Sequence, residues 1–200
     1  LIPTFLLFTI LSCAVVAYGF ARLRFPGRDL LFSLTLATLM IPAIVTLIPT
    51  FLLFKTFGMI GSYAPLIVPR FFGDAFFIFM MRQFFKSLPE ELADAARVDG
   101  ASEFRIFWQI MLPLVQPALI VVGVFTFLWT WHDFFGPLIY LSDSNQFPLS
   151  LGLFAFRAQR TTEWGLMMAG SVLATLPLVI IFFVAQKYFI EGIKLTGVKG

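Results

Sequence analysis

The side chains that could carry acid–base chemistry in this sequence are few. The only histidine, His132, is followed by Asp133 near the end of an apolar run, and Asp74 lies in another. These groups leave a membrane-embedded enzyme open, although a single His-Asp pair at the end of a span is more typical of packing or of a membrane interface. The sequence has no histidines four residues apart, no Gly-x-Ser-x-Gly turn and no phosphate loop ending in Gly-Lys-Ser/Thr. We therefore predict that this chain binds no metal or cofactor of its own.

A second kind of chemistry, the docking of a partner protein, is indicated between residues 82 and 117. Ser87 and Glu90 have the spacing of a capping box, which predicts a helix over residues 88–98. Acidic residues near its start suit the positive end of the helix dipole. We expect one face of this helix to carry a leucine and two small side chains that allow close approach, namely Leu92, Ala95 and Ala96.

A turn and a second short helix follow. Gly100 can adopt a positive φ and end the first helix, and Ser102 can cap the next one. The second helix has an apolar stripe formed by Phe104, Phe107, Trp108 and Met111, and a Leu-Pro pair then closes the segment. A helix-turn-helix that is apolar on one side and acidic near its tip fits a groove in a partner protein. The stripe could equally lie on the membrane surface or on the chain's own helices.

The elements that must position this segment are membrane helices. Hydrophobic residues make up 60% of the chain and charged residues 12%, whereas a soluble domain has about 25% charged residues. The apolar residues form runs long enough to cross a hydrocarbon core, which takes about 20 helical residues. Because the runs are apolar on every side, they indicate helices rather than barrel strands. We predict an all-α, polytopic helical bundle that forms a single transmembrane domain over residues 1–200.

Five spans can be drawn along the chain. They cover residues 2–20, 30–54, 62–81, 118–141 and 164–185. Pro42 and Pro49 interrupt the second of them, as prolines often do in transporters. Because the chain begins inside an apolar run without an initiator methionine, we expect a sixth span to precede it.

Basic residues orient these spans. Ten of the fourteen Lys and Arg side chains fall in the connections on one side of the predicted bundle. Cytoplasmic loops carry an excess of Lys and Arg, so this side, with segment 82–117 and the C-terminus, is predicted to be cytoplasmic. The same excess explains the pI of about 9.3. A nucleic-acid partner is not predicted, because no block of five or more basic residues occurs.

The docking segment resembles a known motif. Its spacing is similar to that of the cytoplasmic EAA loop in permease subunits of ATP-binding-cassette (ABC) importers, through Asp94, Ala95, Ala96, Gly100, Ile110, Leu112 and Pro113. Residues 98–102 and 112–118 resemble the carbohydrate branch, which includes maltose-type and glycerol-phosphate-type permeases. The chain end resembles the tail of the maltose-type second permease subunit. The resemblance extends over nearly the whole chain.

This resemblance implies one permease subunit of a binding-protein-dependent importer in the cytoplasmic (inner) membrane of a bacterium or archaeon. An ABC ATPase dimer would use ATP and Mg²⁺ and would dock on residues 82–117, which we call the coupling loop. A second permease subunit, giving a heterodimer, and an extracytoplasmic solute-binding protein would complete the complex in the lipid bilayer. The residues implied in ATPase coupling are Asp94, Ala95, Ala96, Asp99, Gly100, Ile110, Leu112 and Pro113, with a second ATPase contact at Gly197, Val198, Lys199 and Gly200.

The sequence departs from the family pattern at two places. The first motif residue of the family is usually Glu, and Asp94 keeps its charge on a side chain that is one methylene shorter. The tail has Lys194, Leu195 and Thr196 where small residues are more usual. The branch implies import of a sugar or related polyol, and the scarcity of mid-span charges fits a neutral, hydroxyl-rich solute. An ABC permease for amino acids, peptides or metals, and a channel, are the alternatives.

Overall fold

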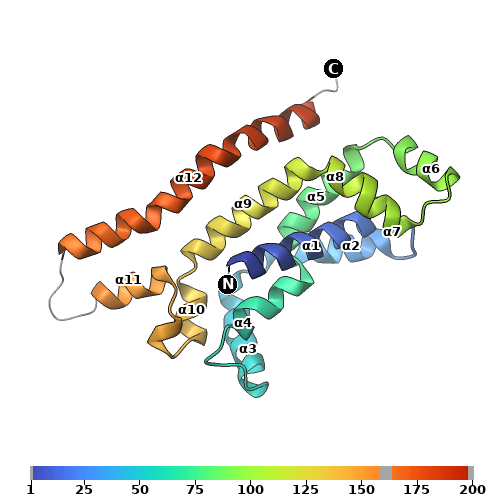
Figure 1. The fold of residues 1–200 in the computed structure, drawn as a ribbon. Coiled ribbons are helices and arrows are strands. Elements are labelled where there is room, and N and C mark those ends of the chain that lie inside the picture. Colours follow the sequence, from blue (N-terminus) through green and yellow to red (C-terminus); the bar gives the residue numbers. More distant parts are fainter. Residues whose placement is uncertain (1, 158–163, 198–200) are drawn as a thin grey trace.

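The computed structural model describes residues 2–157 and 164–197, and these residues form a bundle of helices. Three helices are long, namely α1 (Ile2–Arg22), α9 (Gln116–His132) and α12 (Trp164–Gly197). Figure 1 shows α1 and α9 packed with α5 (Ala75–Ser87), while α12 runs beside α9. The prediction of an all-α polytopic bundle is confirmed.

The core of the bundle lies where α1 meets α5. Cys13, Ala14 and Ala17 are fully buried in α1, because small side chains allow two membrane helices to approach closely. A polar contact joins the same two helices, since the Asp74 N–H donates to Cys13 Sγ over 3.2 Å. Asp74 also caps α5, with its carboxylate accepting from the Phe76 N–H over 2.9 Å. The start of α5 is therefore fixed against α1.

The number of membrane crossings depends on how two bent segments are treated. In the described part of the chain, three helical segments are long and apolar enough to cross alone, namely Ile2–Arg22, Ala64–Ser87 and Trp164–Gln186. Two pairs of helices pass the same test only together, because each is bent by more than 40° at a short break. Counting each pair as one span gives up to five, but the second pair covers Glu103–Leu114 and Gln116–His132 rather than the predicted residues 118–141.

The second predicted span, 30–54, is broken at Pro42, where the sequence predicts an interruption. The chain bends by 100° between Arg28–Met40 and Ala43–Thr56. Ile41 has extended dihedral angles, φ −84° and ψ 114°, because the ring of Pro42 disfavours the helical conformation for the residue before it. The elements on either side are α2 (Arg28–Ala37), η1 (Thr38–Met40) and α3 (Ala43–Thr56).

The fourth predicted span, 118–141, is wrong at its far end. Helix α9 stops at His132, and the chain turns before α10 (Phe135–Tyr140) begins. Asp133 makes this turn, since its Oδ1 accepts from the Gly136 N–H over 3.0 Å. A carboxylate that binds a backbone N–H in this way satisfies a donor that the new helix leaves free.

The two ends of the bundle are built differently (Figure 1). One end, which we call the loop end, carries α6 (Glu91–Val98), α7 (Glu103–Ile106), the π-helix η3 (Phe107–Met111) and α8 (Leu112–Leu114). The opposite end, which we call the cavity end, gathers α3, α10, α4 (Ala64–Ile67), η2 (Val68–Phe72), η4 (Ser144–Gln146) and α11 (Leu149–Arg157).

Candidate functional site

The coupling loop leaves α5 later than the sequence predicts. Helix α5 continues to Ser87, whose Oγ donates to the Phe84 carbonyl oxygen over 2.8 Å. The predicted capping box is therefore wrong, and α6 begins at Glu91 rather than at residue 88. The cause is Pro89, because a proline forces the residue before it out of the helical region. Leu88 accordingly has an extended ψ of 144°.

The turn after α6 forms as predicted. Gly100 has φ 79°, its N–H donates to Arg97 O over 3.0 Å, and the Ala101 N–H donates to Ala96 O over 2.9 Å. These two bonds form a Schellman motif, in which the left-handed residue ends the helix and satisfies its last carbonyls. Ser102 then caps α7 by accepting from the Arg105 N–H over 3.4 Å.

The alanines of α6 do not share one face. Ala96 is 8% exposed and packs into the core together with Ala93, whereas Leu92 and Ala95 are exposed. Adjacent residues on a helix point about 100° apart, so Ala95 and Ala96 cannot both face the same partner squarely. The predicted face of Leu92, Ala95 and Ala96 is thus corrected, because Ala96 faces the chain itself. Val98, at 87% exposure, completes the open surface.

The apolar stripe of the second helix is also divided. Phe107 and Met111 are buried, while Phe104 is 74% exposed and Trp108 39%. The stripe therefore lies partly on the chain's own helices and partly open. A π-turn marks this stretch, with the Leu112 N–H donating to Phe107 O.

Pro113 explains that π-turn. A proline has no N–H for the carbonyl four residues earlier, and its ring crowds that carbonyl, so the preceding turn widens. Ile110 and Leu112 pack against the core as partly buried residues. After Val115 the chain enters α9 at a bend of 76°. The end of the EAA-like motif is thus the joint between the loop and a membrane helix.

A chain of polar side chains crosses the loop and reaches α1. Arg97 Nη1 lies 2.6 Å from Asp94 Oδ1, and Arg97 Nε lies 2.7 Å from Glu103 Oε1. The second oxygen of Glu103 accepts from the Tyr18 hydroxyl over 2.9 Å. The hydrogen bond to Glu103 is the main cause that raises the pKa of the Arg97 guanidinium. Sequence reasoning missed Tyr18, because nothing local connects it to a residue 85 positions later.

Two arginines tie α1 and α5 together at the loop end. Arg22, in the last turn of α1, donates to the carbonyls of Phe85 and Leu88 at the end of α5. In return, Arg82 of α5 donates to the Phe20 carbonyl near the end of α1 over 3.1 Å. Free carbonyls at a helix C-terminus carry partial negative charge, so a cationic donor is favourable there. The ends of α1 and α5, beside which α6 projects, are therefore joined by hydrogen bonds.

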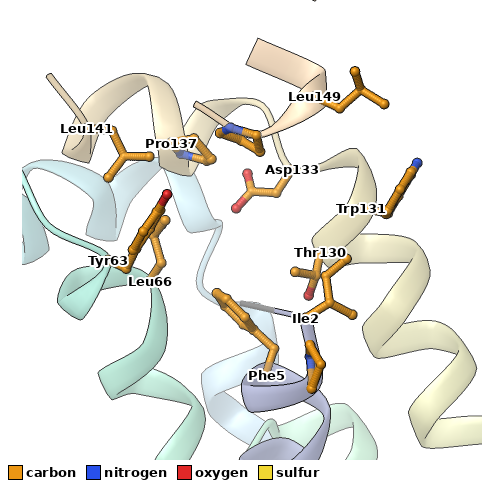
Figure 2. A pocket seen from close by; sticks show the side chains of 12 residues that line it. Ile2, Phe5, Tyr63, Leu66, Thr130, Trp131, Asp133, Pro137, Leu141 and Leu149 are labelled. Carbon is orange, nitrogen blue, oxygen red and sulfur yellow. The ribbon is translucent and has the colours of Figure 1, made fainter. Parts of the chain in front are cut away.

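The cavity end contains a cavity of about 390 Å³. Its walls come from the start of α1, from α4, from the end of α9 and from the segments that follow (Figure 2). The lining is mainly apolar and aromatic, with Tyr63, Thr130 and Asp133 as polar groups. The Tyr63 hydroxyl donates to Gln146 O over 2.8 Å, so part of this polarity is used within the chain.

The two carboxylates that could serve an enzyme have structural partners. Asp74 and Asp133 each accept backbone N–H groups at the start of a helix. His132 is exposed in the last turn of α9. Within the described residues, no group of three or more His, Cys, Asp or Glu side chains could hold a metal ion. The carboxylates thus position helices.

Gly136 offers a test of the turn at the cavity end. A Cβ at this position would lie 2.6 Å from Asp133 Oδ2 and 2.8 Å from Leu66 Cδ2. We expect Gly136→Ala to destabilise the protein by about 1–3 kcal/mol, the usual effect of overpacking. Thermal unfolding in detergent would measure it, with Gly152→Ala as the control because a Cβ there meets nothing within 4 Å. Equal midpoints for the two variants would show that the turn does not hold Asp133 as described.

The predicted C-terminal contact falls at the edge of the structure. Gly197 is the last residue of α12. Val198, Lys199 and Gly200 lie outside the described residues.

Comparisons with known proteins identify the architecture. Residues 2–195 match the family model described as binding-protein-dependent transport system inner membrane component. The arabinooligosaccharides transport system permease protein AraQ of Bacillus subtilis is 38% identical over 192 residues, covering 96% of this chain and 68% of AraQ. The lactose transport system permease protein LacG of Rhizobium radiobacter is 33% identical, covering 92% of this chain and 67% of LacG. The sn-glycerol-3-phosphate transport system permease protein UgpE of Yersinia enterocolitica is 35% identical, covering 88% of this chain and 63% of UgpE.

A solved structure agrees with these relatives. A chain of a bacterial ABC transporter involved in the import of the acidic polysaccharide alginate matches with a TM-score of 0.81 and 25% identity, covering 94% of this chain and 72% of that one. The present chain spans about two thirds of the length of the curated relatives. By its family match and its identity to these relatives, the chain belongs to the binding-protein-dependent transport system inner membrane components, the permease subunits of ABC transporters.

Proposed function

We propose that this chain and a second permease subunit form the membrane pathway of an importer for a sugar or related polyol. In this proposal an ABC ATPase dimer, which uses ATP and Mg²⁺, docks on the coupling loop at the cytoplasmic side. An extracytoplasmic binding protein delivers the solute to the other side. The observation that carries the proposal is α6, a short helix that projects at the loop end (Figure 1). Its outer side chains are exposed.

The open face of α6 supports docking in a groove of the ATPase. Leu92, Ala95 and Val98 are exposed there, so their burial by a partner would remove apolar surface from water. The Asp94 side chain is 65% exposed although it pairs with Arg97. A basic group of the ATPase could therefore share this carboxylate without the ion pair first being broken. Its shorter side chain, compared with the usual Glu, still leaves it at the surface.

The remaining motif residues have separate parts in this proposal. Gly100 sets the angle between α6 and α7, and the exposed Asp99 lies beside it as the C-cap residue that follows α6. Ile110, Leu112 and Pro113 form the joint with α9, through which movement of the loop would reach the membrane. Rigid elements with two arrangements are how such coupling is transmitted.

The solute, the orientation and the tail are further parts of the proposal. The relatives' names specify arabinooligosaccharides, lactose and sn-glycerol 3-phosphate, which supports a hydroxyl-rich solute. The excess of Lys and Arg supports a cytoplasmic loop end and C-terminus. We propose that Gly197, Val198, Lys199 and Gly200 add a second contact to the ATPase.

Affinity purification of the full-length protein from gently solubilised membranes tests this function. We expect an ABC ATPase, a second permease and a binding protein to copurify, with more ATPase retained in one nucleotide state than in the other. Proteoliposomes of that complex should then import at least one of arabinooligosaccharide, lactose and sn-glycerol 3-phosphate. Recovery of the chain without an ATPase, with and without ATP, would contradict the proposal.

A further inference from the structure

We propose that Tyr18, Glu103 and Arg97 form a polar tie that makes the coupling loop and α1 move as one body. This inference rests on the proposed function, because it concerns how movement that the ATPase imposes on α6 reaches the membrane helices. The three residues are positioning residues, since none of them would touch the solute. In this account the movement reaches α1 directly and does not depend on α9 alone.

Tyr18 is held in place by packing on two sides. It is 5% exposed, and its ring lies 5.6 Å from that of Phe85 in α5 and 5.0 Å from that of Phe107 in the loop. Such a ring has little freedom to turn, and a buried tyrosine hydroxyl needs a hydrogen-bond partner. Glu103 provides that partner at 2.9 Å. The contact between α1 and the loop is therefore built from both packing and a charge-assisted bond.

Glu103 can join the elements because each of its two oxygens has a different partner. Oε2 accepts from Tyr18 of α1, and Oε1 accepts from Arg97 of α6. Hydrogen bonds with an ionised partner are shorter and stronger than neutral ones. Glu103 is also the first residue of α7, directly after the cap at Ser102. One carboxylate thus fixes α6, α7 and α1 relative to one another.

The covalent route from the loop to the membrane is less suited to carry force on its own. It runs through the π-turn of Phe107–Met111 and then through the 76° bend that precedes α9. Departures from regular helical hydrogen bonding are where helices bend. The polar tie avoids both features by joining the loop to α1 before the π-turn.

Helix α1 can pass the movement on. Its end is joined to α5 by the two arginine contacts, Arg22 to Phe85 and Leu88, and Arg82 to Phe20. Movement transmitted by Tyr18 would therefore shift the parallel pair of α1 and α5 together. The structure in this way gives the ATPase a route to two core helices besides α9.

The test measures the relative movement of the loop and α1 in the assembled importer. Nitroxide labels at Arg24→Cys, after the end of α1, and Phe104→Cys, in α7, would report their distance with and without ATP, because the native Cys13 is fully buried. We expect one narrow distance in both states for the labelled parent. Tyr18→Phe and Glu103→Gln should each broaden the distribution when ATP is added. The matched control is Tyr140→Phe, which changes a buried tyrosine at the cavity end and should leave the distance distribution narrow.

The double variant makes the test sharper. If Tyr18 and Glu103 act through one bond, the double variant should have a distance distribution no broader than that of the more affected single variant. The effects of substitutions at two interacting residues are not additive. Additive effects, or a Tyr18→Phe variant that behaves like Tyr140→Phe, would overturn the tie. The amount of ATPase that copurifies distinguishes a failure of the proposed function from a failure of the polar tie. Loss of ATPase from the unsubstituted complex contradicts the proposed function, whereas retained ATPase with an unchanged distance in Tyr18→Phe contradicts only the tie.

Discussion

Valine in place of Gly100 is expected to abolish ATP-driven uptake while the chain remains in the membrane. Gly100 has φ 79° and forms the Schellman turn that ends α6. A left-handed conformation costs a non-glycine residue about 1–2 kcal/mol, and a β-branched side chain is among the least tolerant. The turn would open, and the angle between α6 and α7 would no longer fit the ATPase.

The structure predicts an order of effects for Gly100 that depends on the backbone and not on side-chain size. A Cβ at this position would meet nothing within 4 Å, so the positive φ, rather than a contact at Cβ, is the constraint. Asparagine tolerates the left-handed region better than alanine, and alanine better than valine. Uptake should therefore fall in the order Asn, Ala, Val. Leucine, which is large but not β-branched, should resemble alanine.

Uptake of whichever solute the unsubstituted complex imports would be measured alongside the amount of chain in the membrane and the amount of copurified ATPase. Gly19→Ala is the control, because a Cβ there also meets nothing within 4 Å and Gly19 does not have a positive φ. Unchanged uptake in Gly100→Val would count heavily against the coupling loop as described. A fall that followed side-chain volume, with leucine worse than valine, would contradict the backbone explanation.

The parts of the fold that could be predicted from the sequence are those determined by residues close together in the chain. Apolar runs longer than about 20 residues can only be satisfied as helices in a bilayer, which fixes the fold class. The turn at Gly100 and the cap at Ser102 were predictable because each depends on residues within five positions. For the same reason a helix, a turn and a second helix could be predicted within residues 82–117.

The sequence misled where two local signals compete. Ser87 and Glu90 have capping-box spacing, yet Pro89 excludes the helix start that this pattern implies. Pro42 marks an interruption in the sequence, but the 100° size of the bend does not follow from a proline alone. When a proline and a capping pattern overlap, the steric constraint of the ring prevails.

Contacts between distant segments could not be predicted from one sequence. Tyr18 and Glu103 are 85 positions apart, and neither has a neighbour that marks it as a partner. Arg22 and Arg82 counted only as topogenic charges in the sequence, yet both are buried and each binds the end of the other's helix. Basic residues that orient a membrane protein can therefore also hold its helices together, when their side chains donate hydrogen bonds to the carbonyls at a helix end.

Leucine in place of Ala96 and leucine in place of Ala95 are expected to fail at different steps. Ala96 is 8% exposed and packs against the core, whereas Ala95 lies on the open face of α6. Leucine is nearly as good a helix former as alanine, so neither change should unwind α6 by itself. The difference must then come from what each side chain meets.

In Ala96→Leu the larger side chain has to enter the packed core beneath α6. Overpacking of this kind costs about 1–3 kcal/mol, a large share of what holds one short helix to the bundle. We expect the amides of α6 to exchange faster with deuterated water in the isolated subunit, and the ATPase to be lost from the purified complex. In Ala95→Leu the isolated subunit should exchange like the unsubstituted one, and only recovery of the ATPase should fall.

The pair decides which face of α6 the partner uses. Both variants change one residue of the same motif by the same three carbon atoms, so composition, charge and propensity are matched. Full ATPase recovery with Ala95→Leu would show that the exposed face is not the docking surface. Normal exchange in the Ala96→Leu subunit, together with lost ATPase, would instead place Ala96 at the interface and require α6 to rotate when the partner binds.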